Sequence, residues 1–418
     1  MWSLLRANPP LAWLCASTLF VFMSKSMLDP LASLYVVELG GSPAVVGAAV
    51  ASAFVIPALV AVPIGRVVDR IGAPRMLVAG TLVLIFSALV VAVRPGMATL
   101  FVSRVANGLA HVILLVATQV HVAAVASGHR REEAISWYST FVSAGQLVGP
   151  LAVGALVDLA GFQAAFAAGA AAAALALAPS GRLQVHEGQT SLAARREDPA
   201  QPPGGWGRRR QAAPAGSAGI RELLRNDGVK VAIAVSSGIL FAMGARQAFL
   251  PVYLYSLGFS TTLIGFLLSL RSVVSMAIRP WIPAMIAVMG GRRRALIGAT
   301  LLTAAGLGLT GLARDPVSIG FLSILIGIGI GASQPLTIVA VADHVEEGKQ
   351  GVALGLRLAA NRTAQLINPV IFGLVAEAAG FAVTFLIAGL LIGLVGAMVR
   401  QWGAVLDRRG RAAAAGAE

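Results

Sequence analysis

A small set of ionisable side chains lies inside long apolar segments of this 418-residue chain. Lys25 and Asp29 are four residues apart, which places them on one face of a helix, where they can form an ion pair. Arg104, in a later apolar segment, is expected at a similar depth. Desolvation favours the neutral form of a buried carboxyl group, and nearby cations favour its charged form. These opposing effects would allow Asp29 to take up and release a proton.

We therefore expect Asp29 to carry a coupled proton, with Arg104 and Lys25 controlling its charge. His111 follows Arg104 by two helical turns, and its imidazole, which titrates near neutrality, could relay protons from the same cavity. Two simpler interpretations stay open. The three charges could form a static structural cluster, and His111 could be a hydrogen-bonded structural histidine.

Polar side chains also occur inside the apolar segments of the second half of the chain. They are Arg246, Gln247, Arg271, Arg357, Asn361, Arg362, Gln365 and Asn368. Asn361, Gln365 and Asn368 follow one another at four and three residues, so they share a helix face that must line a cavity or another helix. Together with the arginines they predict a cationic substrate cavity, which would favour an anionic or zwitterionic solute.

Twelve apolar segments must position these side chains. They cover residues 11–37, 43–64, 75–93, 97–127, 132–157, 162–179, 229–255, 261–288, 295–313, 316–342, 350–376 and 380–399. Each has about the 20 residues that cross a hydrocarbon core of roughly 30 Å. The chain is 57% hydrophobic and 12% charged, whereas about a quarter of the residues are charged in soluble domains. The sequence therefore predicts an all-α membrane protein with twelve transmembrane helices.

The second half of the chain repeats the first at an offset of 218 or 219 residues. Aligned identities include Tyr35 with Tyr253, Arg75 with Arg293, Gln146 with Gln365 and Pro150 with Pro369. Duplicated membrane halves are typical of secondary transporters, which bind substrate at the interface of the halves. We expect one six-helix half at 1–179, a linker at 180–227, a second half at 228–402 and a tail at 403–418. The linker, rich in Gly, Pro and Arg, is expected to be disordered because it cannot bury a core.

The net charge of +14 is concentrated in the termini, the linker and alternate loops. By the positive-inside rule these parts are cytoplasmic, and we expect a multi-pass protein of a bacterial-type inner (plasma) membrane. This distribution argues against nucleic acid as a partner. The expected partners are the lipid bilayer and a small-molecule substrate, and the chain is expected to work as a monomer.

No disulfide, metal centre or cofactor is expected. The chain has a single cysteine, Cys15, which lies in an apolar run. No spaced set of His, Asp and Glu indicates a metal, and no phosphate-binding glycine loop occurs. A proton gradient, not ATP, is therefore the expected source of energy.

A short charged motif connects the second and third apolar segments. It reads GRVVDRIG, with Gly65, Asp69, Arg70 and Gly72 at its defining positions. This motif resembles the G-x-L-a-D-r-x-G-r-k signature of the major facilitator superfamily. The resemblance implies a fold of two six-helix halves and a loop that latches the halves together on the cytoplasmic side.

The motif departs from the superfamily signature at one place. Ala73 and Pro74 stand where two basic residues are usual, and Arg75 restores only one. The resemblance also offers a role for Arg357, which could pair with Asp69 to hold the outward-facing state. Arg357 is therefore a candidate gating residue as well as a candidate cavity residue.

Two further motifs resemble those of proton-coupled members of the superfamily. Arg104 to Gly108 is similar to the pattern R-x-x-q-G. Gly145, Gly149 and Pro150 fit the pattern G-x-x-x-G-P-x-x-G-G of drug antiporters, with Val153 in place of one glycine. Glycines at i and i+4 allow close helix packing, and a proline bends the helix.

These features predict a secondary active transporter that works by alternating access, with proton-coupled efflux of a small organic solute. The cationic residues favour a different interpretation, the proton-coupled uptake or exchange of an organic anion. A lipid flippase on the same scaffold is a third. An enzyme is not expected, because the sequence contains neither an acidic metal site nor a cluster of nucleophiles.

Overall fold

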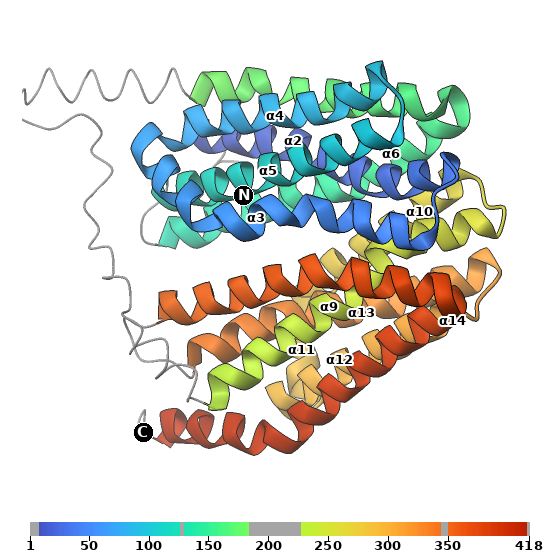
Figure 1. Cartoon of the computed structure of the whole chain (residues 1–418). Helices are drawn as coiled ribbons and strands as arrows, with labels where there is room; N and C mark the ends of the chain where they lie inside the picture. Colours follow the sequence, from blue (N-terminus) through green and yellow to red (C-terminus); the bar gives the residue numbers. More distant parts are fainter. Residues whose placement is uncertain (1–7, 126–128, 184–226, 344–349, 416–418) are drawn as a thin grey trace, which may run out of the picture. The chain divides into compact units, whose positions relative to one another are not determined.

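The computed structural model describes residues 8–125, 129–183, 227–343 and 350–415. These residues form helices, and no strand occurs among them (Figure 1). The helices are α2 (Pro9–Glu38), α3 (Pro43–Ile71), α4 (Ala73–Val93), α5 (Met97–Val125), α6 (His129–Leu175), α9 (Asp227–Ser256), α10 (Thr261–Ala277), η1 (Arg279–Trp281), α11 (Ile282–Val288), α12 (Arg292–Thr310), α13 (Pro316–Asp343) and α14 (Gln350–Ala415). The predicted all-α membrane fold is confirmed. Most of the predicted linker, 184–226, lies outside the described residues.

Nine helical stretches within the described residues are long and apolar enough to span a membrane. They differ from the predicted twelve at three places. α6 and α14 each join two predicted segments and are interrupted only at Gly161 and Gly380, whose positive φ values favour glycine. α12, which begins with three arginines, is not among the nine. Twelve spans therefore stays a prediction.

The sequence repeat extends to the backbone and the packing. Glycines aligned by the repeat have similar φ angles: Gly40 (76°) and Gly258 (82°), Gly72 (95°) and Gly290 (70°), and Gly161 (80°) and Gly380 (81°). The aromatic contacts repeat as well: Tyr35 lies against Phe162 and Phe166, and Tyr253 lies against Phe381 and Phe385. The two copies therefore build the same local structures at equivalent positions.

Unit 1 of the fold comprises Met1–Leu39, Ser52–Arg210 and Ser260–Gly265, and in its described part α6 packs along α2 and α4 packs along α5. Two glycines of α6 make its contact with α2 close. A Cβ on Gly145 would lie 2.6 Å from the Leu19 carbonyl oxygen, and a Cβ on Gly149 would lie 2.6 Å from that of Met23. The Ser26 hydroxyl joins the helices by donating to the Gly145 carbonyl oxygen at 2.9 Å. The α2 and α6 backbones can approach this closely because glycine has no side chain.

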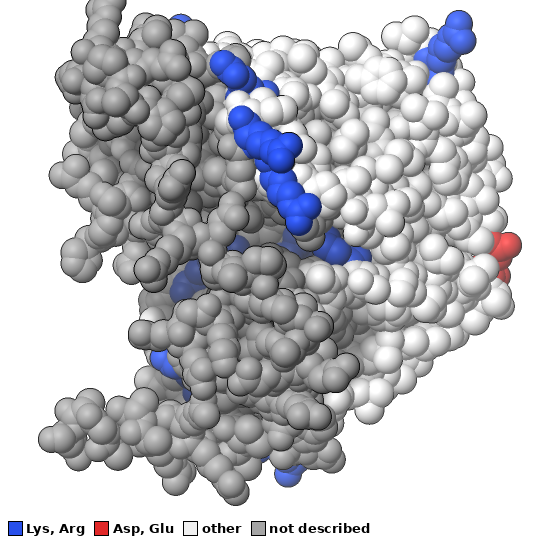
Figure 2. Space-filling model, turned by 60° about the vertical axis from the view of Figure 1, so that its left-hand side comes forward, with Lys and Arg blue, Asp and Glu red and all other residues white. Residues whose placement is uncertain are grey.

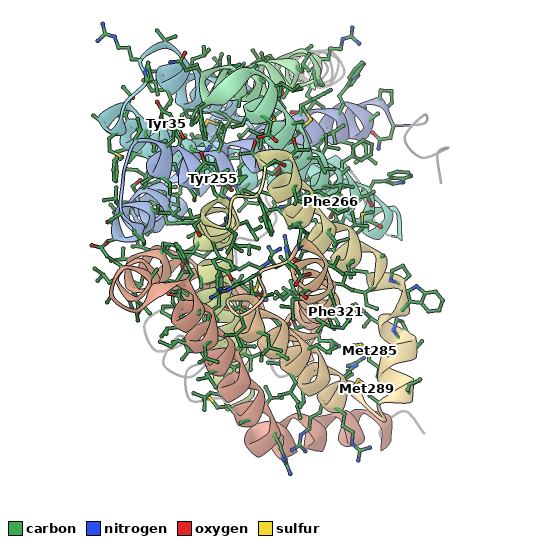
Figure 3. All side chains as sticks on the ribbon, turned by 90° about the vertical axis from the view of Figure 1, so that its right-hand side faces the viewer. Tyr35, Tyr255, Phe266, Met285, Met289 and Phe321 are labelled. Atoms are coloured by element: carbon green, nitrogen blue, oxygen red, sulfur yellow. The ribbon has the colours of Figure 1, made fainter. Side chains whose placement is uncertain are left out.

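Unit 2 comprises Gly40–Ala51, Gln211–Phe259 and Phe266–Glu418, and in its described part α9 and α12 pack along α14. Its buried apolar cluster consists of Val235, Ile239, Ala295, Leu296, Leu336, Val395 and Val399. Met285 and Met289 pack against this cluster from α11 and its C-terminal end (Figure 3). The helices of unit 2 are therefore held together by an apolar core.

Large apolar side chains lie exposed on both units. Phe86 of unit 1 is 53% exposed, and Phe266 and Phe321 of unit 2, labelled in Figure 3, are 52% and 59% exposed. Figure 2 shows a broad area without charged side chains, with Lys and Arg gathered beside it. Exposed apolar surface of this extent suits contact with lipid and not with water.

The close contact between α2 and α6 predicts that Gly149→Val destabilises the protein. The added side chain would collide with the α2 backbone, and overpacking of this kind lowers the free energy of unfolding by about 1–3 kcal/mol. The measurement is the apparent melting temperature of the purified protein in detergent. Gly393→Ala is the control, because no atom lies within 4 Å of a Cβ at that helical position. An unchanged melting temperature for Gly149→Val would contradict the close contact.

Candidate functional site

The site with paired charges, here called the Asp29 site, consists of Lys25, Asp29 and Arg104 in unit 1. Lys25 and Asp29 lie one turn apart on α2, and the Lys25 Nζ donates to Asp29 Oδ2 at 2.6 Å. Arg104 of α5 donates from Nη1 to Asp29 Oδ1 at 3.1 Å. The Asp29 side chain is 17% exposed and that of Arg104 is 4% exposed. One carboxylate thus contacts two cations from two helices, an arrangement that stabilises a negative charge on it.

α5 carries further polar groups besides the Arg104 guanidinium that binds Asp29. The Arg104 Nε and the Asn107 Nδ2 are buried, and neither has a hydrogen-bond partner in the part of the chain that the structure describes. His111 lies edge-on to Phe22 of α2, with ring centroids 6.3 Å apart. α5 therefore presents spare hydrogen-bond donors inside unit 1, and the relay role of His111 stays a prediction.

Two arginines of unit 2 lie deep in their spans. Arg246 of α9 is 4% exposed, and its Nε and Nη2 are buried without a hydrogen-bond partner among the described residues. Arg271 of α10 donates from Nη2 to the adjacent Ser272 hydroxyl at 3.2 Å, and its Nε is buried without a partner in the same described part. Gln247, next to Arg246, is exposed. The two guanidinium groups therefore keep unused hydrogen-bond capacity.

The polar residues of α14 have local partners. The Asn361 Oδ1 accepts hydrogen bonds from the Ser236 and Ser237 hydroxyls of α9, at 3.0 and 3.1 Å. The Arg362 Nη1 donates to the Gln365 Oε1 at 3.0 Å. The amide oxygen of Asn361 thus joins α14 to α9, so at this position the polar face lies against another helix. The role of these residues in a substrate cavity stays a prediction.

Two other candidate residues of α14, Asn368 and Arg357, are buried. Asn368 is buried and packs against the backbone of Gly244, so close that a Cβ on Gly244 would collide with its amide group. Arg357 is 5% exposed. Its predicted partner, Asp69, has a side chain outside the described residues, so the pairing of Asp69 with Arg357 is untested.

In the segment that resembles the superfamily signature, a glycine and a proline define how α4 begins. Gly72 has φ 95°, which other residues rarely adopt, and it caps the N-terminus of α4. Ala73 and Pro74 are buried in the first turn of α4, where proline is tolerated because the first N–H groups of a helix have no partner within it. Arg70 is exposed and Gly65 has open space around it. Pro74 thus starts a helix at a position where basic residues are usual in the superfamily.

A carboxylate caps the first turn of one helix in each unit. In unit 1, Asp158 accepts four hydrogen bonds at the start of α10, from the N–H and hydroxyl groups of Thr261 (3.0 and 2.7 Å) and of Thr262 (2.7 and 2.6 Å). In unit 2, Glu377 accepts bonds at the start of α3, from the Ser42 hydroxyl (2.6 Å) and the Ala44 N–H (3.0 Å). Free N–H groups at a helix N-terminus favour such an anion.

Asp158 and Glu377 do not belong to the predicted site residues, although the repeat contains their signal. They lie 219 residues apart, and the helix starts that they cap, at Ser42 and Ser260, lie 218 residues apart. Two acids at equivalent positions of the copies, each near a span end, indicate a repeated contact. The sequence does not show which helix start each of them reaches.

Comparison with known proteins gives the family. The model described as Major Facilitator Superfamily matches residues 14–313 and 285–416. An uncharacterised MFS-type transporter of Mycobacterium tuberculosis is 34% identical over 111 residues, which cover 27% of this chain. The match spans only 19% of that relative's length.

Solved structures share the fold. The nucleoside transporter NupG superposes with a TM-score of 0.72 at 15% identity, covering 94% of this chain and 98% of that one. A peptide transporter of the POT type in complex with sulfate superposes with a TM-score of 0.71 at 16% identity, covering 96% of each chain. At these identities the likeness concerns the fold alone.

The two carboxylate caps predict a ranked loss of stability. Asp158→Ala removes four hydrogen bonds and Glu377→Ala removes two, so we expect both variants to melt at lower temperature, with the larger drop for Asp158→Ala. Thermal unfolding in detergent measures this order. Asp315→Ala changes a fully exposed carboxylate that bonds to the Ser318 N–H at the start of α13; it is the control and should change the melting temperature least. A wild-type melting temperature for Asp158→Ala would contradict the role of the cap.

Proposed function

The chain belongs to the major facilitator superfamily, and on this basis we propose that it is a proton-coupled exporter of a small organic solute. A membrane transporter of this type works by alternating access and needs a source of energy. We propose that the proton gradient supplies it through Asp29, without a bound cofactor, and that one chain forms the transport unit.

One observation carries the proposal of proton coupling. The Asp29 carboxylate lies in the interior of unit 1, and both of its oxygens are bound by cations on two helices, α2 and α5. A proton on Asp29 would remove its charge, and Lys25 and Arg104 would then lose their attraction to it. Protonation is therefore linked to the contact between α2 and α5, which is the physical requirement for a coupled conformational change.

The packing of α6 supports a link from the Asp29 site to the antiporter-like motif. Gly145 and Gly149 of this motif press against residues 19–27 of α2, the turns that lead into Lys25 and Asp29. A rearrangement of α2 on protonation would shift the surface on which α6 rests, because the two backbones are in close contact and the Ser26 hydroxyl bonds to the Gly145 carbonyl oxygen. This arrangement supports antiport, and with it the export direction.

The orientation is also part of the proposal. Several arginines lie at helix ends: Arg66 and Arg70 in the last turns of α3, Arg75 in the first turn of α4, and Arg292, Arg293 and Arg294 at the start of α12. We propose that these helix ends and both termini face the cytoplasm of a cell with a bacterial-type inner membrane.

A second function is favoured by Arg246 and Arg271. Buried arginines without carboxylate partners would suit the uptake or exchange of an organic anion, which uses the same fold and the same proton site. Export and uptake differ in the direction of the solute movement relative to the proton.

Everted membrane vesicles test the proton coupling. A respiration-driven pH gradient quenches acridine orange, and a solute that exchanges for protons restores its fluorescence. We expect at least one solute in a panel of organic anions and cationic dyes to restore fluorescence in wild-type vesicles, and none to do so with Asp29→Asn.

Asp315→Asn is the matched control, because it also neutralises an aspartate but in an exposed loop, and it should behave as the wild type. Solute-dependent recovery of fluorescence by Asp29→Asn would overturn the assignment of Asp29. Recovery of fluorescence only in vesicles preloaded with the solute would instead support uptake, because a symporter moves solute and proton out of the lumen together.

A further inference from the structure

We propose that one surface of unit 2 binds an anionic phospholipid, its phosphate held by arginines and its acyl chains by an apolar helix face. This surface, here called the α11 surface, consists of the exposed side chains of Trp281, Ala284, Ala287, Val288, Arg292 and Arg294, from the end of η1 to the first turn of α12. The proposed binding is independent of the transported solute and of the proton site.

The apolar stretch that contains α10 and α11 is longer than one membrane crossing requires. Thr261–Val288 has 28 residues, about 42 Å at 1.5 Å per residue, whereas the hydrocarbon core is roughly 30 Å thick. α10 alone, with 17 residues, accounts for about 25 Å of this length. The exposed Arg279 follows α10, and a long cationic side chain near the end of a span reaches for the lipid headgroups. We therefore place α11, which comes next, at the membrane surface.

α11 has one side packed on the protein and one side open. Met285 and Met289 pack against the apolar core of unit 2 (Figure 3), yet no residue of α11 is fully buried. On the open side Trp281 is 67% exposed and Val288 is 89% exposed. Large apolar side chains this exposed indicate a binding surface, and tryptophan is enriched where hydrocarbon meets headgroups. The open side of α11 therefore suits the upper part of an acyl chain.

The internal repeat shows that this open side differs from its counterpart in the first copy. At the offset of 218 residues, charged positions of the first copy are apolar in the second: Arg66, Asp69 and Arg70 correspond to Ala284, Ala287 and Val288. The three side chains of the second copy are all exposed. Charged side chains at exposed positions favour contact with water, so their replacement indicates that the open side of α11 meets an apolar partner.

A cluster of arginines follows the apolar side directly. Arg292, Arg293 and Arg294 form the first turn of α12, which contains no acidic residue. The Arg293 Nη2 donates to the Arg400 carbonyl oxygen, which brings this part of α14 beside them. Arg292, Arg294 and Arg400 are exposed. Cations in the first turn of a helix repel one another and oppose the helix dipole, so a neighbouring anion stabilises this arrangement.

The acidic side chains that the structure describes in unit 2 lie at the opposite end of these helices. Asp315 comes after the last residue of α12, whereas the arginines stand at its first turn. Glu377 comes just before the kink of α14 at Gly380, and the helix then runs from this kink to Arg400. The end of unit 2 that carries the α11 surface is therefore strongly cationic within the described residues.

The order of these features along the chain selects a phospholipid as the occupant. An anionic phospholipid carries a phosphate next to acyl chains, just as Arg292 and Arg294 follow the apolar side of α11. A soluble phosphate would leave Trp281 and Val288 in water. An acidic peptide would bring its polar backbone against them without partners for its N–H and C=O groups. The lipid satisfies both parts of the surface at once.

Quenching of tryptophan fluorescence by brominated lipids tests the proposal on the purified full-length protein in detergent. Phosphatidylglycerol and phosphatidylcholine are added with the same brominated acyl chains, and Trp281→Phe shows which part of the quenching comes from Trp281. We expect saturable quenching of Trp281 by phosphatidylglycerol, with an apparent affinity about tenfold or more above that of phosphatidylcholine. Equal quenching by the two lipids would overturn the proposal, because the arginines would then add nothing.

A double variant tests the arginine cluster. Each basic residue near an anionic lipid surface contributes roughly a fivefold factor, so Arg292→Gln with Arg294→Gln should weaken the binding of phosphatidylglycerol by about tenfold or more. Arg293 is kept, because it joins α12 to α14. The matched control, Arg94→Gln with Arg314→Gln, removes the same charge at exposed positions elsewhere and should bind as the wild type does. Equal loss in both double variants would reduce the effect to net charge and overturn the proposal.

A variant of the apolar side gives a readout that leaves the arginines intact. Val288→Asp places an anion on the open side of α11, and it should weaken the binding of phosphatidylglycerol without lowering the melting temperature, because Val288 is 89% exposed. Wild-type binding by Val288→Asp would overturn the proposal. A wild-type dimer in light scattering that Val288→Asp dissociates would assign the surface to a second copy of the chain and also overturn it.

Competition with a headgroup separates the lipid from a soluble anion. Glycerol phosphate has the phosphate of the lipid and no acyl chains, so at millimolar concentration it should leave the quenching by brominated phosphatidylglycerol unchanged. Full displacement by glycerol phosphate would make the arginines a site for soluble phosphate and would overturn the lipid as the occupant.

Discussion

The ion pairs of Asp29 with Lys25 and Arg104 are the interaction on which the proposed transport mechanism depends. In the interior of a membrane protein a charge is tolerated only when it is neutralised or hydrated. Here the Asp29 carboxylate forms ion pairs with two cations on two helices, Lys25 Nζ at 2.6 Å and Arg104 Nη1 at 3.1 Å. The proton that removes this carboxylate's charge would therefore release two side chains at once. Because α6 packs closely on α2, a movement of α2 at this site would displace α6 as well.

The internal repeat gives the two units a common framework and different charges. Positive-φ glycines, aromatic contacts and carboxylate caps recur at equivalent positions. The buried charges do not recur: unit 1 has an anion with its cations, whereas unit 2 has Arg246 and Arg271 without a described anion. Such a division suits a transporter in which one half handles the proton and the other the substrate. Each half can then change its chemistry while the packing stays the same.

The sequence predicted features that depend on local spacing. An interval of four residues predicted the Lys25–Asp29 pair, and span length predicted the all-α membrane fold. The sequence could not predict which helices contact each other, or through which faces, because an apolar helix can rotate about its axis without a change in its composition. For that reason the bonds of Asn361 to Ser236 and Ser237, and the reach of Asp158 to the start of α10, appear only in the structure. The functional roles of the site residues stay predictions.

The most direct test of the central claim compares two modes of transport in proteoliposomes containing the same solute. One is solute exchange at equal pH on both sides, and the other is solute flux driven by a pH gradient. If Asp29 carries the coupled proton, Asp29→Asn keeps the exchange and loses the response to the gradient, because only the second mode requires a proton to bind and leave. A variant whose flux still follows the pH gradient would contradict the account.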